Sequence, residues 1–291
     1  MIPKEVMKKV RHIEIRTTRL VNDLFGGEYE SVFKGQGIEF ADVREYVPGD
    51  DIRSIDWNVT ARSHTTYIKK YAEERELTVL FVVDMSGSQY FGTGQRLKSE
   101  VAAEITALLA FSAVQNHDKT GLLIATDRVE KFVPVKKGKT HVLRVVREIL
   151  YYKPKGFKTR LSEAFEYLHK TLSRTSVVFI ISDFMDNSFE KPLKILAQRH
   201  DVIAIHLKDR REESLPDVGL LEVIDPESGE MFLVNTADKK IRQQFEASAR
   251  ERNEKLSKLF KSLRIDRIEI PVEGSYVEPL IKFFKIRERR L

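Results

Sequence analysis

The feature that most constrains the fold is a regular alternation, beginning at Leu77, of short apolar runs with segments of helical periodicity. Strand-like runs rich in β-branched residues lie at 77–83, 121–126, 128–135, 176–182 and 201–207, and helical segments lie near 96–116, 140–151, 161–172 and 189–199. Strands this apolar need helices on both faces of their sheet, an arrangement typical of mainly parallel sheets. We therefore predict an α/β fold with a doubly wound, mainly parallel sheet, in which ligands bind at the carboxyl ends of the strands.

The first 76 residues follow a different pattern and are predicted to form an N-terminal extension. Helical spacing of apolar residues runs from Pro3 to Phe25, and a polar, turn-rich block with strand-like pieces such as "YIKKY" continues to Glu76. Within it, residues 40–62 place charges of both signs around Trp57, the only tryptophan. We expect these charges to form ion pairs and caps that pack the block on the main domain, with a partner-binding surface as the alternative. The predicted division is thus 1–76 and 77–291.

The chain beyond Asp209 is expected to complete the same doubly wound domain. A hairpin is predicted from strands at 220–224 and 231–234, joined through the turn signal Pro226–Gly229. A long charged helix at 237–263, a last strand at 264–272 and a last helix at 276–291 follow.

Composition narrows the possible chemistry and location. The chain has no cysteine, which removes disulfides, thiolate metal sites and cysteine nucleophiles. It has no apolar run long enough to span a membrane and no signal-peptide core, so we expect a cytosolic protein without membrane contact. The net charge of +6 arises at the C-terminal end, where residues 236–291 carry 15 basic and 9 acidic side chains. Because acids are interleaved with these bases, we interpret them as a solvated helix face; a nucleic-acid surface is the alternative.

Oxygen-bearing side chains follow two of the predicted strands. Asp84, Ser86 and Ser88 come directly after one buried strand, and Asp183 ends another. If the two strands are neighbours, these side chains meet at one edge of the sheet. Carboxylate and hydroxyl oxygens without imidazole or thiolate suit a hard cation such as Mg²⁺, or Mn²⁺ or Ca²⁺ in its place.

The loop "DMSGS" resembles the Asp-x-Ser-x-Ser signature of von Willebrand factor type A domains. In that family a metal-ion-dependent adhesion site adds a Thr and an Asp from later loops, and the resemblance implies Thr159 and Asp183 for these roles. The family often has Gly-Gly-Thr at the Thr loop, whereas this chain has Phe157-Lys158-Thr159. The resemblance further implies that a partner protein supplies an acidic residue to the metal.

The preceding segment, "GQGIEFADVREYVPGDDIRSIDWNVTARSHTTYIKKYAEERE", is similar to the bacterial and archaeal family once catalogued as domain of unknown function number fifty-eight. Members are commonly encoded beside MoxR-type AAA+ ATPases. The resemblance therefore implies an adaptor that works with such an ATPase and is not itself an enzyme.

Other function classes have weaker support in the sequence. A strand-end Asp phosphatase needs an acid two residues later, where this chain has Ser86. "KGKT" at 137–140 lacks the earlier glycine of a Walker loop, and neither HExxH nor GxSxG occurs. A metal-dependent hydrolase of phosphate esters, with Asp183 or Glu163 as base, and a nucleic-acid-binding module remain the alternatives.

Overall fold

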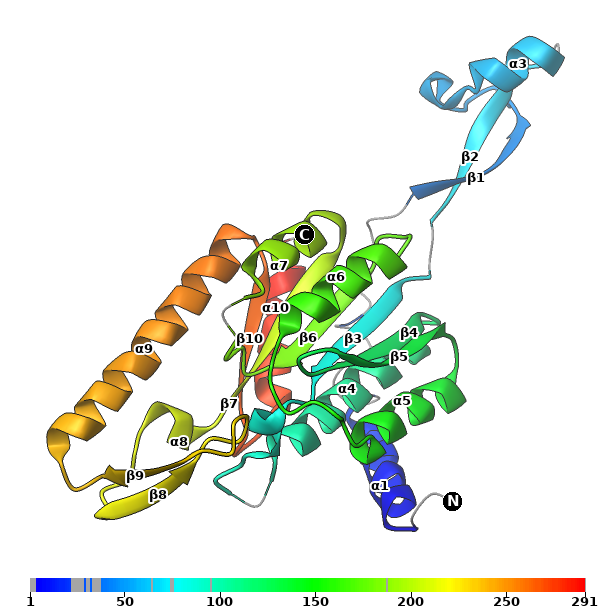
Figure 1. The fold of residues 1–291 in the computed structure, drawn as a ribbon. Coiled ribbons are helices and arrows are strands. Elements are labelled where there is room, and N and C mark those ends of the chain that lie inside the picture. Colours follow the sequence, from blue (N-terminus) through cyan, green and yellow to red (C-terminus); the bar gives the residue numbers. More distant parts are fainter. Residues whose placement is uncertain are drawn as a thin grey trace.

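The computed structural model describes residues 4–21, 29, 32, 38–63, 65–73, 76–94, 96–186 and 188–290. The main sheet is formed by β3 (Thr78–Asp84), β4 (Lys119–Ala125), β5 (Val129–Lys136), β6 (Val177–Ser182), β7 (Asp201–Lys208) and β10 (Asp266–Pro271). These six strands have the order β10-β7-β6-β3-β4-β5 (Figure 1). Every neighbouring pair is parallel except β4 and β5. The predicted fold class is therefore confirmed.

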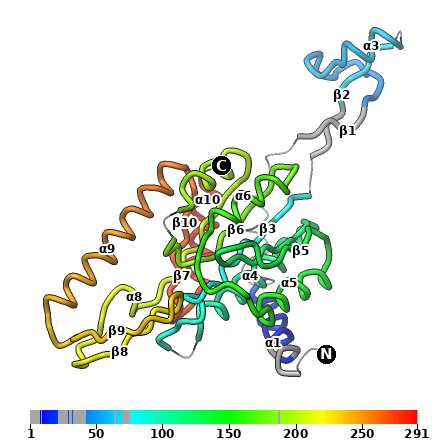
Figure 2. Tube along the Cα trace, viewed as in Figure 1, coloured from blue at the N-terminus to red at the C-terminus, as the bar shows by residue number. Residues whose placement is uncertain are grey.

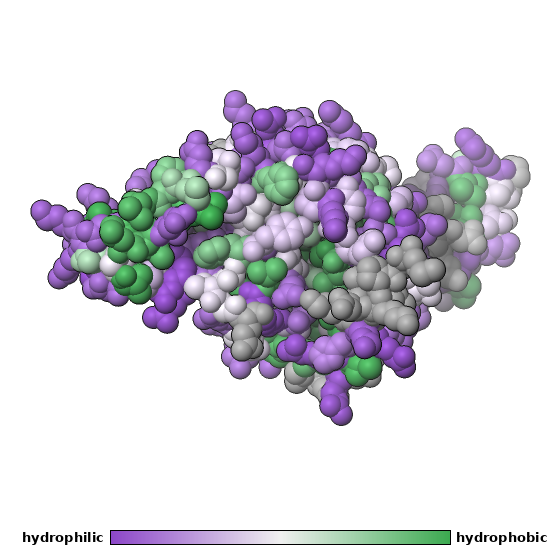
Figure 3. All heavy atoms as spheres, turned by 60° about the horizontal axis from the view of Figure 1, so that its bottom comes forward, coloured by the Kyte–Doolittle hydropathy of each residue, from purple (hydrophilic) through white to green (hydrophobic). Residues whose placement is uncertain are grey.

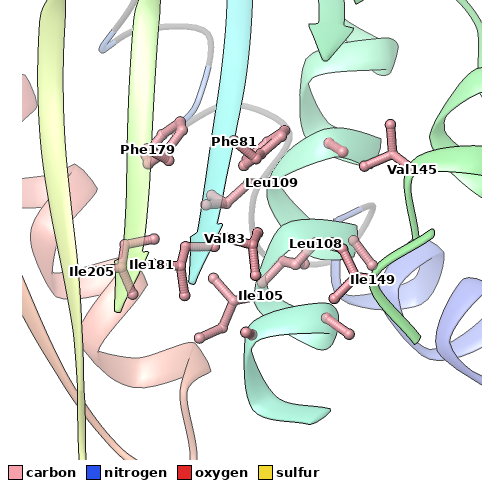
Figure 4. Close-up of a cluster of buried hydrophobic side chains, with 14 of the residues drawn as sticks. Phe81, Val83, Ile105, Leu108, Leu109, Val145, Ile149, Phe179, Ile181 and Ile205 are labelled. Atoms are coloured by element: carbon pink, nitrogen blue, oxygen red, sulfur yellow. The ribbon is translucent and has the colours of Figure 1, made fainter. Parts of the chain in front are cut away.

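Helices cover both faces of the sheet. One face carries α1 (Lys4–Leu20), α4 (Lys98–Gln115), α5 (Lys139–Tyr151) and α10 (Val277–Glu288), and the other carries α6 (Leu161–Thr171), α7 (Glu190–Arg199) and the end of α9 (Lys239–Ser262). Alternate residues of β3 divide between the two cores, since Phe81 and Val83 belong to the first and Leu80 and Val82 to the second. Figure 4 shows the first core, where side chains of β3, β6 and β7 meet those of α4 and α5.

The helix α4 is buried over most of its length because it lies between the sheet and two other helices, α1 and α5. Its sequence, "KSEVAAEITALLAFSAVQ", has apolar and small residues on every side, as such a position requires. Val10 and Ile13 of α1 are each only 7% exposed within the same core. The first helix of the N-terminal extension is therefore part of the sheet domain, and residues 22–25 of the helix predicted there lie outside the described residues.

The turn-rich block forms a hairpin that stands clear of the sheet domain in Figure 1. It consists of β1 (Ile38–Glu45), η2 (Ile52–Ser54), α3 (Trp57–Ser63) and β2 (Tyr67–Glu73). Arg44 donates to both carboxylate oxygens of Asp50 at 2.7 and 2.8 Å, and Asp51 and Asp56 accept backbone N–H groups of the short helices that follow them. The charges act as ion pairs and caps, but within the block. Trp57 itself is 67% exposed, and packing of the block on the main domain stays a prediction.

The segment between β7 and β10 only partly joins the main sheet. Strand β10 pairs with β7 as the completed domain requires, whereas β8 (Leu220–Ile224) and β9 (Met231–Asn235) form a two-stranded sheet of their own after the short helix α8 (Arg210–Glu213). Only Phe260 of α9 is buried among the described residues, so the predicted apolar stripe packs on the sheet at its C-terminal end alone. Figure 2 follows this segment from β7 through α8, β8 and β9 into α9, beside the loop that leaves β3.

The order of strands defines where a ligand site is expected. From β3 the chain proceeds to β4 and β5 at one edge, and it then returns to β6, β7 and β10 on the other side. The direction of winding thus reverses between β3 and β6, and the carboxyl ends of these two strands flank the switch point of the sheet.

Candidate functional site at the ends of β3 and β6

Asp84 is the last residue of β3 and is completely buried. Its Oδ1 accepts the backbone N–H of Ser86 at 2.9 Å, and its Oδ2 accepts the hydroxyl of Ser182 at 2.6 Å. Both donors are neutral groups. Burial raises the pKa of Asp84 to about 7, the charge of Asp183 adds to this rise, and the hydrogen bonds from Ser182 and Ser86 oppose it. The carboxyl group therefore lies where a positive charge would stabilise its ionised form.

The two serines predicted beside Asp84 lie side by side in the loop after β3. Ser86 precedes the 3-10 turn η3 (Gly87–Tyr90), which contains Ser88, and the two hydroxyl oxygens are 3.2 Å apart. Two oxygens bound next to each other on an octahedral Mg²⁺ at about 2.1 Å lie about 3 Å apart. The spacing and the hardness of these oxygens thus fit a small divalent cation. Within the described part of the chain, no group of three or more His, Asp or Glu side chains is placed to hold a metal, so a cation here would depend on hydroxyl ligands.

Asp183, which follows β6, is paired with a lysine that the sequence analysis missed. Lys98, the first residue of α4, donates to Asp183 Oδ2 at 2.7 Å and also to Glu212 of α8. The side chains of Lys98 and Asp183 are 0% and 1% exposed. Burial by itself lowers the pKa of Lys98, but the two carboxylates outweigh burial and leave the pKa raised. The site thus contains its own cation, Lys98, which forms an ion pair with Asp183. Asp84, by contrast, accepts hydrogen bonds from neutral donors.

The chain makes a sharp turn directly after Asp183. Phe184 has φ 54°, in the left-handed region that bulky residues rarely adopt. Its N–H bonds to the hydroxyl of Ser182 at 2.9 Å, and its buried ring packs on Phe189 and Phe260. These contacts hold the strained conformation and fix the direction in which Asp183 leaves the strand.

Thr159 lies in the loop between α5 and α6, and this loop touches the loop of the serines. The N–H of Gly87 donates to the carbonyl of Phe157 at 2.7 Å. The hydroxyl of Thr159 donates to Glu227 Oε1 and its N–H donates to Glu227 Oε2 at 3.3 Å. Thr159 is therefore brought to the same rim as predicted, although its hydrogen-bond partner is an acid from the β8–β9 turn and not a residue of the predicted set. The metal-binding role of the five predicted residues, Asp84, Ser86, Ser88, Thr159 and Asp183, stays a prediction.

The loop that carries Thr159 is anchored by Glu130 of β5. One oxygen of this carboxylate accepts the N–H groups of Gly156 at 2.7 Å and Lys155 at 3.1 Å, and the hydroxyl of Thr126 at 3.0 Å. The other accepts the hydroxyl of Tyr152 at 3.1 Å. Burial raises the pKa of Glu130, but the hydrogen bonds together lower it below its ordinary value. The fold thus favours the ionised form of Glu130, and this carboxylate holds the loop that carries Thr159 in place.

Glu130→Ala is expected to lower the free energy of unfolding by roughly 1 to 3 kcal/mol, because backbone N–H groups lose a charged acceptor. Glu130→Gln, which retains an acceptor oxygen without the charge, should lose less. Urea unfolding of the three proteins at pH 7 measures both effects. If alanine and glutamine variants were both as stable as the unmodified chain, Glu130 would not be the anchor of this loop.

Several site residues were not predicted from the sequence. Ser182 stood next to Asp183 at a strand end and could have been noticed there, and Glu227 lies within the turn signal that was recognised. Lys98 and Glu212 carry no local signal, because each is a charged residue at the start or end of a helix like many others in this chain.

Relatives and solved structures resemble this chain over most of its length. "Uncharacterized protein Rv1480" of Mycobacterium tuberculosis is 29% identical over 283 residues, which cover 96% of this chain and 89% of the relative. An aerotolerance-related membrane protein from Bacteroides fragilis aligns with a TM-score of 0.48 and 11% identity, covering 74% of this chain and 100% of that one. The SpRpn10 VWA domain aligns with a TM-score of 0.39 and 12% identity, covering 72% and 95% of the two chains.

These comparisons correct the location predicted from the sequence. The expectation of a cytosolic protein is contradicted by structural neighbours that are described as membrane proteins, and it is not retained. Among the helices that the structure describes, none combines enough length with enough apolar character to span a bilayer.

The family itself is established by sequence. The family described as "Protein of unknown function DUF58" matches residues 42–255, which include most of the turn-rich block, the sheet from β3 to β7 and most of the segment that follows it. All five predicted metal ligands lie inside this range. The match spans well over half of the chain, and the protein therefore belongs to this family.

Proposed function

We propose that this protein is a non-catalytic, metal-dependent interaction module that binds an acidic residue of a partner protein. The observation that carries the proposal is the pair of serine hydroxyls, 3.2 Å apart, beside a buried Asp84 whose pKa is raised to about 7. Asp84, Ser86 and Ser88 would hold a divalent cation together with Thr159 and Asp183. Mg²⁺ is the cation that this set of oxygens suits best, with Mn²⁺ as its practical substitute.

The chemistry of the donors explains why a partner acid would be recognised. Hydroxyl ligands are neutral, so a divalent cation held by them supplies a strongly positive position that is open to a further anionic oxygen. The charge of Asp183 is compensated in part by its ion pair with Lys98, so Asp183 offsets less of the charge of a bound cation. A carboxylate from another protein satisfies this requirement.

The surroundings of Thr159 favour an acidic partner as well. Lys153, Lys155, Lys158 and Arg160 lie on the exposed side of the same loop region. Positive charges at the rim of a binding site speed the encounter with an acidic surface. By family resemblance, a MoxR-type AAA+ ATPase is the partner that we propose, with this chain acting as its adaptor.

The test is binding of the purified chain to a MoxR-type ATPase of the same organism, measured by surface plasmon resonance with Mg²⁺ and with chelator. We expect binding that weakens by on the order of tenfold or more in chelator and in Asp84→Ala, because each removes part of one ligand shell. Asp127→Ala is the matched control, since Asp127 lies just beyond β4 at the same rim and pairs with Arg128. Undiminished binding in chelator and by Asp84→Ala would contradict the proposal.

A further inference from the structure

The segment between β7 and α9 is held against the candidate site by acidic side chains. Asp209, directly after β7, accepts the N–H of Thr93 at 3.0 Å and also its hydroxyl. Glu212 of α8 accepts from Lys98, and Glu227 of the β8–β9 turn accepts from Thr159. The last of these contacts is made with a residue of the proposed metal site itself.

The turn that carries Glu227 is closed by hydrogen bonds of both its side chains and its backbone. Asp225 Oδ1 accepts the N–H of Glu227 at 2.9 Å, and Asp225 Oδ2 accepts the hydroxyl of Ser228 at 2.8 Å. The backbone closes the turn through Gly229 N to Asp225 O at 2.8 Å and Asp225 N to Glu230 O at 2.9 Å. Gly229 has φ 74°, which glycine adopts without strain. Glu227 is thus presented from a preformed turn and loses little conformational freedom when it binds.

The same turn lies directly on the serine loop. A Cβ added to Gly87, between Ser86 and Ser88, would lie 2.2 Å from the carbonyl oxygen of Pro226. This contact is independent of the hydrogen bond between Thr159 and Glu227, and it comes from the other loop of the site. The turn therefore docks between the two loops that carry the proposed hydroxyl ligands.

The strands behind the turn are not packed into the molecule. Leu220, Met231 and Leu233 are 68%, 67% and 70% exposed, and Phe232 is 51% exposed. Figure 3 shows hydrophobic side chains gathered at the end of the molecule that carries this hairpin. Because little apolar surface of the strands is buried, moving the tip away from the site sacrifices few contacts beyond those of the tip.

We propose that Glu227 is an internal ligand of the candidate metal site, which the acidic residue of a partner must displace. The inference rests on the proposed function and specifies its regulation. Glu227 offers the same carboxylate that the partner would bring, and its connection to the chain gives it a high effective concentration at the site. Only molecules in which Glu227 has left the site can bind the partner. The partner's apparent affinity is therefore its intrinsic affinity multiplied by the fraction of such molecules.

The inference also describes what the site recognises. A partner segment that competes with Glu227 is expected to present a glutamate at the tip of a tight turn, as the sequence "DPESG" does here. A peptide of residues 222–232, "EVIDPESGEMF", is therefore a probe that the chain itself supplies.

The experiment measures binding of this fluorescently labelled peptide by anisotropy, in Mg²⁺, to the unmodified chain and to Glu227→Gln. Glutamine has the shape of glutamate without its charge, so the variant should leave the turn intact and the site open. We expect Glu227→Gln to bind the peptide on the order of tenfold or more tightly than the unmodified chain does. The same peptide with glutamine at the position of Glu227 should bind neither protein, and chelator should abolish the difference.

Gly87→Ala tests the docking by steric means. Gly87 does not have a left-handed backbone, so alanine fits locally while its methyl group displaces Pro226. The same methyl group also excludes the proline of the peptide, so we expect this variant to bind the peptide no more tightly than the unmodified chain does. Hydrogen exchange of the turn amides should rise in both Gly87→Ala and Glu227→Gln, because each releases the turn from the site.

Binding of Mn²⁺ without peptide, followed by electron paramagnetic resonance, separates the two possible failures. Equal peptide affinity of Glu227→Gln and the unmodified chain, or no peptide binding by either, with Mn²⁺ bound by both, would overturn the internal ligand and leave the metal site intact. Absence of bound Mn²⁺ from every protein would overturn the metal site and the internal ligand with it.

Discussion

Replacing Lys98 by methionine is expected to lower the free energy of unfolding by roughly 3 to 5 kcal/mol. The ammonium group is completely buried between Asp183 and Glu212, and methionine fills a similar volume without the charge. The two carboxylates would remain close together in the protein interior with no cation between them, and this unpaired charge is the cause of the loss. Urea unfolding with chelator present, at pH 7, measures the change.

Lys139→Met is the matched control for this variant. Lys139 is also the first residue of a helix, α5, and also forms an ion pair, with Glu14 at 2.8 Å, but its side chain is 60% exposed. Its loss should change the stability by less than about 1 kcal/mol. If Lys98→Met and Lys139→Met lowered the free energy of unfolding by similar amounts, burial of Lys98 would not be the cause of its loss.

Asp84 is expected to make the metal-free protein less stable as the pH rises from about 4 to 7. Its pKa is raised from 3.8 to about 7 in the folded state, so the folded protein holds this proton more tightly than the unfolded chain does. The resulting stabilisation is complete below pH 3.8 and is lost as the pH rises through 7. The difference corresponds to roughly 4 kcal/mol over this range, at about 1.4 kcal/mol per pH unit.

Other acids in the chain change the profile in the opposite sense, so the comparison must be made with Asp84→Asn. Asp50 and Glu130, for example, have lowered pKa values and stabilise the fold as the pH rises. Subtracting the profile of Asp84→Asn from that of the unmodified chain, both in chelator, isolates the contribution of Asp84. Saturating Mg²⁺ should flatten this difference, because a bound cation competes with the proton. If the stability of Asp84→Asn and that of the unmodified chain changed identically with pH, Asp84 would not have a raised pKa in the folded protein.

The fold was predictable because strands and helices are encoded in local patterns. The strand residues 77–83 and 176–182 are apolar at every position that faces either core, and this requires helices on both faces of the sheet. The position of the hairpin of β8 and β9 was not predictable. Its apolar side chains stay exposed, although its sequence of apolar and polar residues is the same as that of a strand pair packed on a core. The same applies to the first half of α9, whose apolar stripe is not buried on the sheet.

The sequence by itself determined the part of the site that lies on adjacent positions. Asp84, Ser86 and Ser88 follow one strand at alternate positions, so their oxygens are neighbours wherever that strand is placed, and Asp183 ends a second strand of the same type. Only the tertiary structure decided what surrounds them. Lys98 is 85 positions from Asp183, Ser182 is 98 from Asp84, and Glu227 is 68 from Thr159. These contacts form because the winding of the sheet reverses between β3 and β6 and brings separate loops to one rim, and no local pattern of residues encodes that meeting.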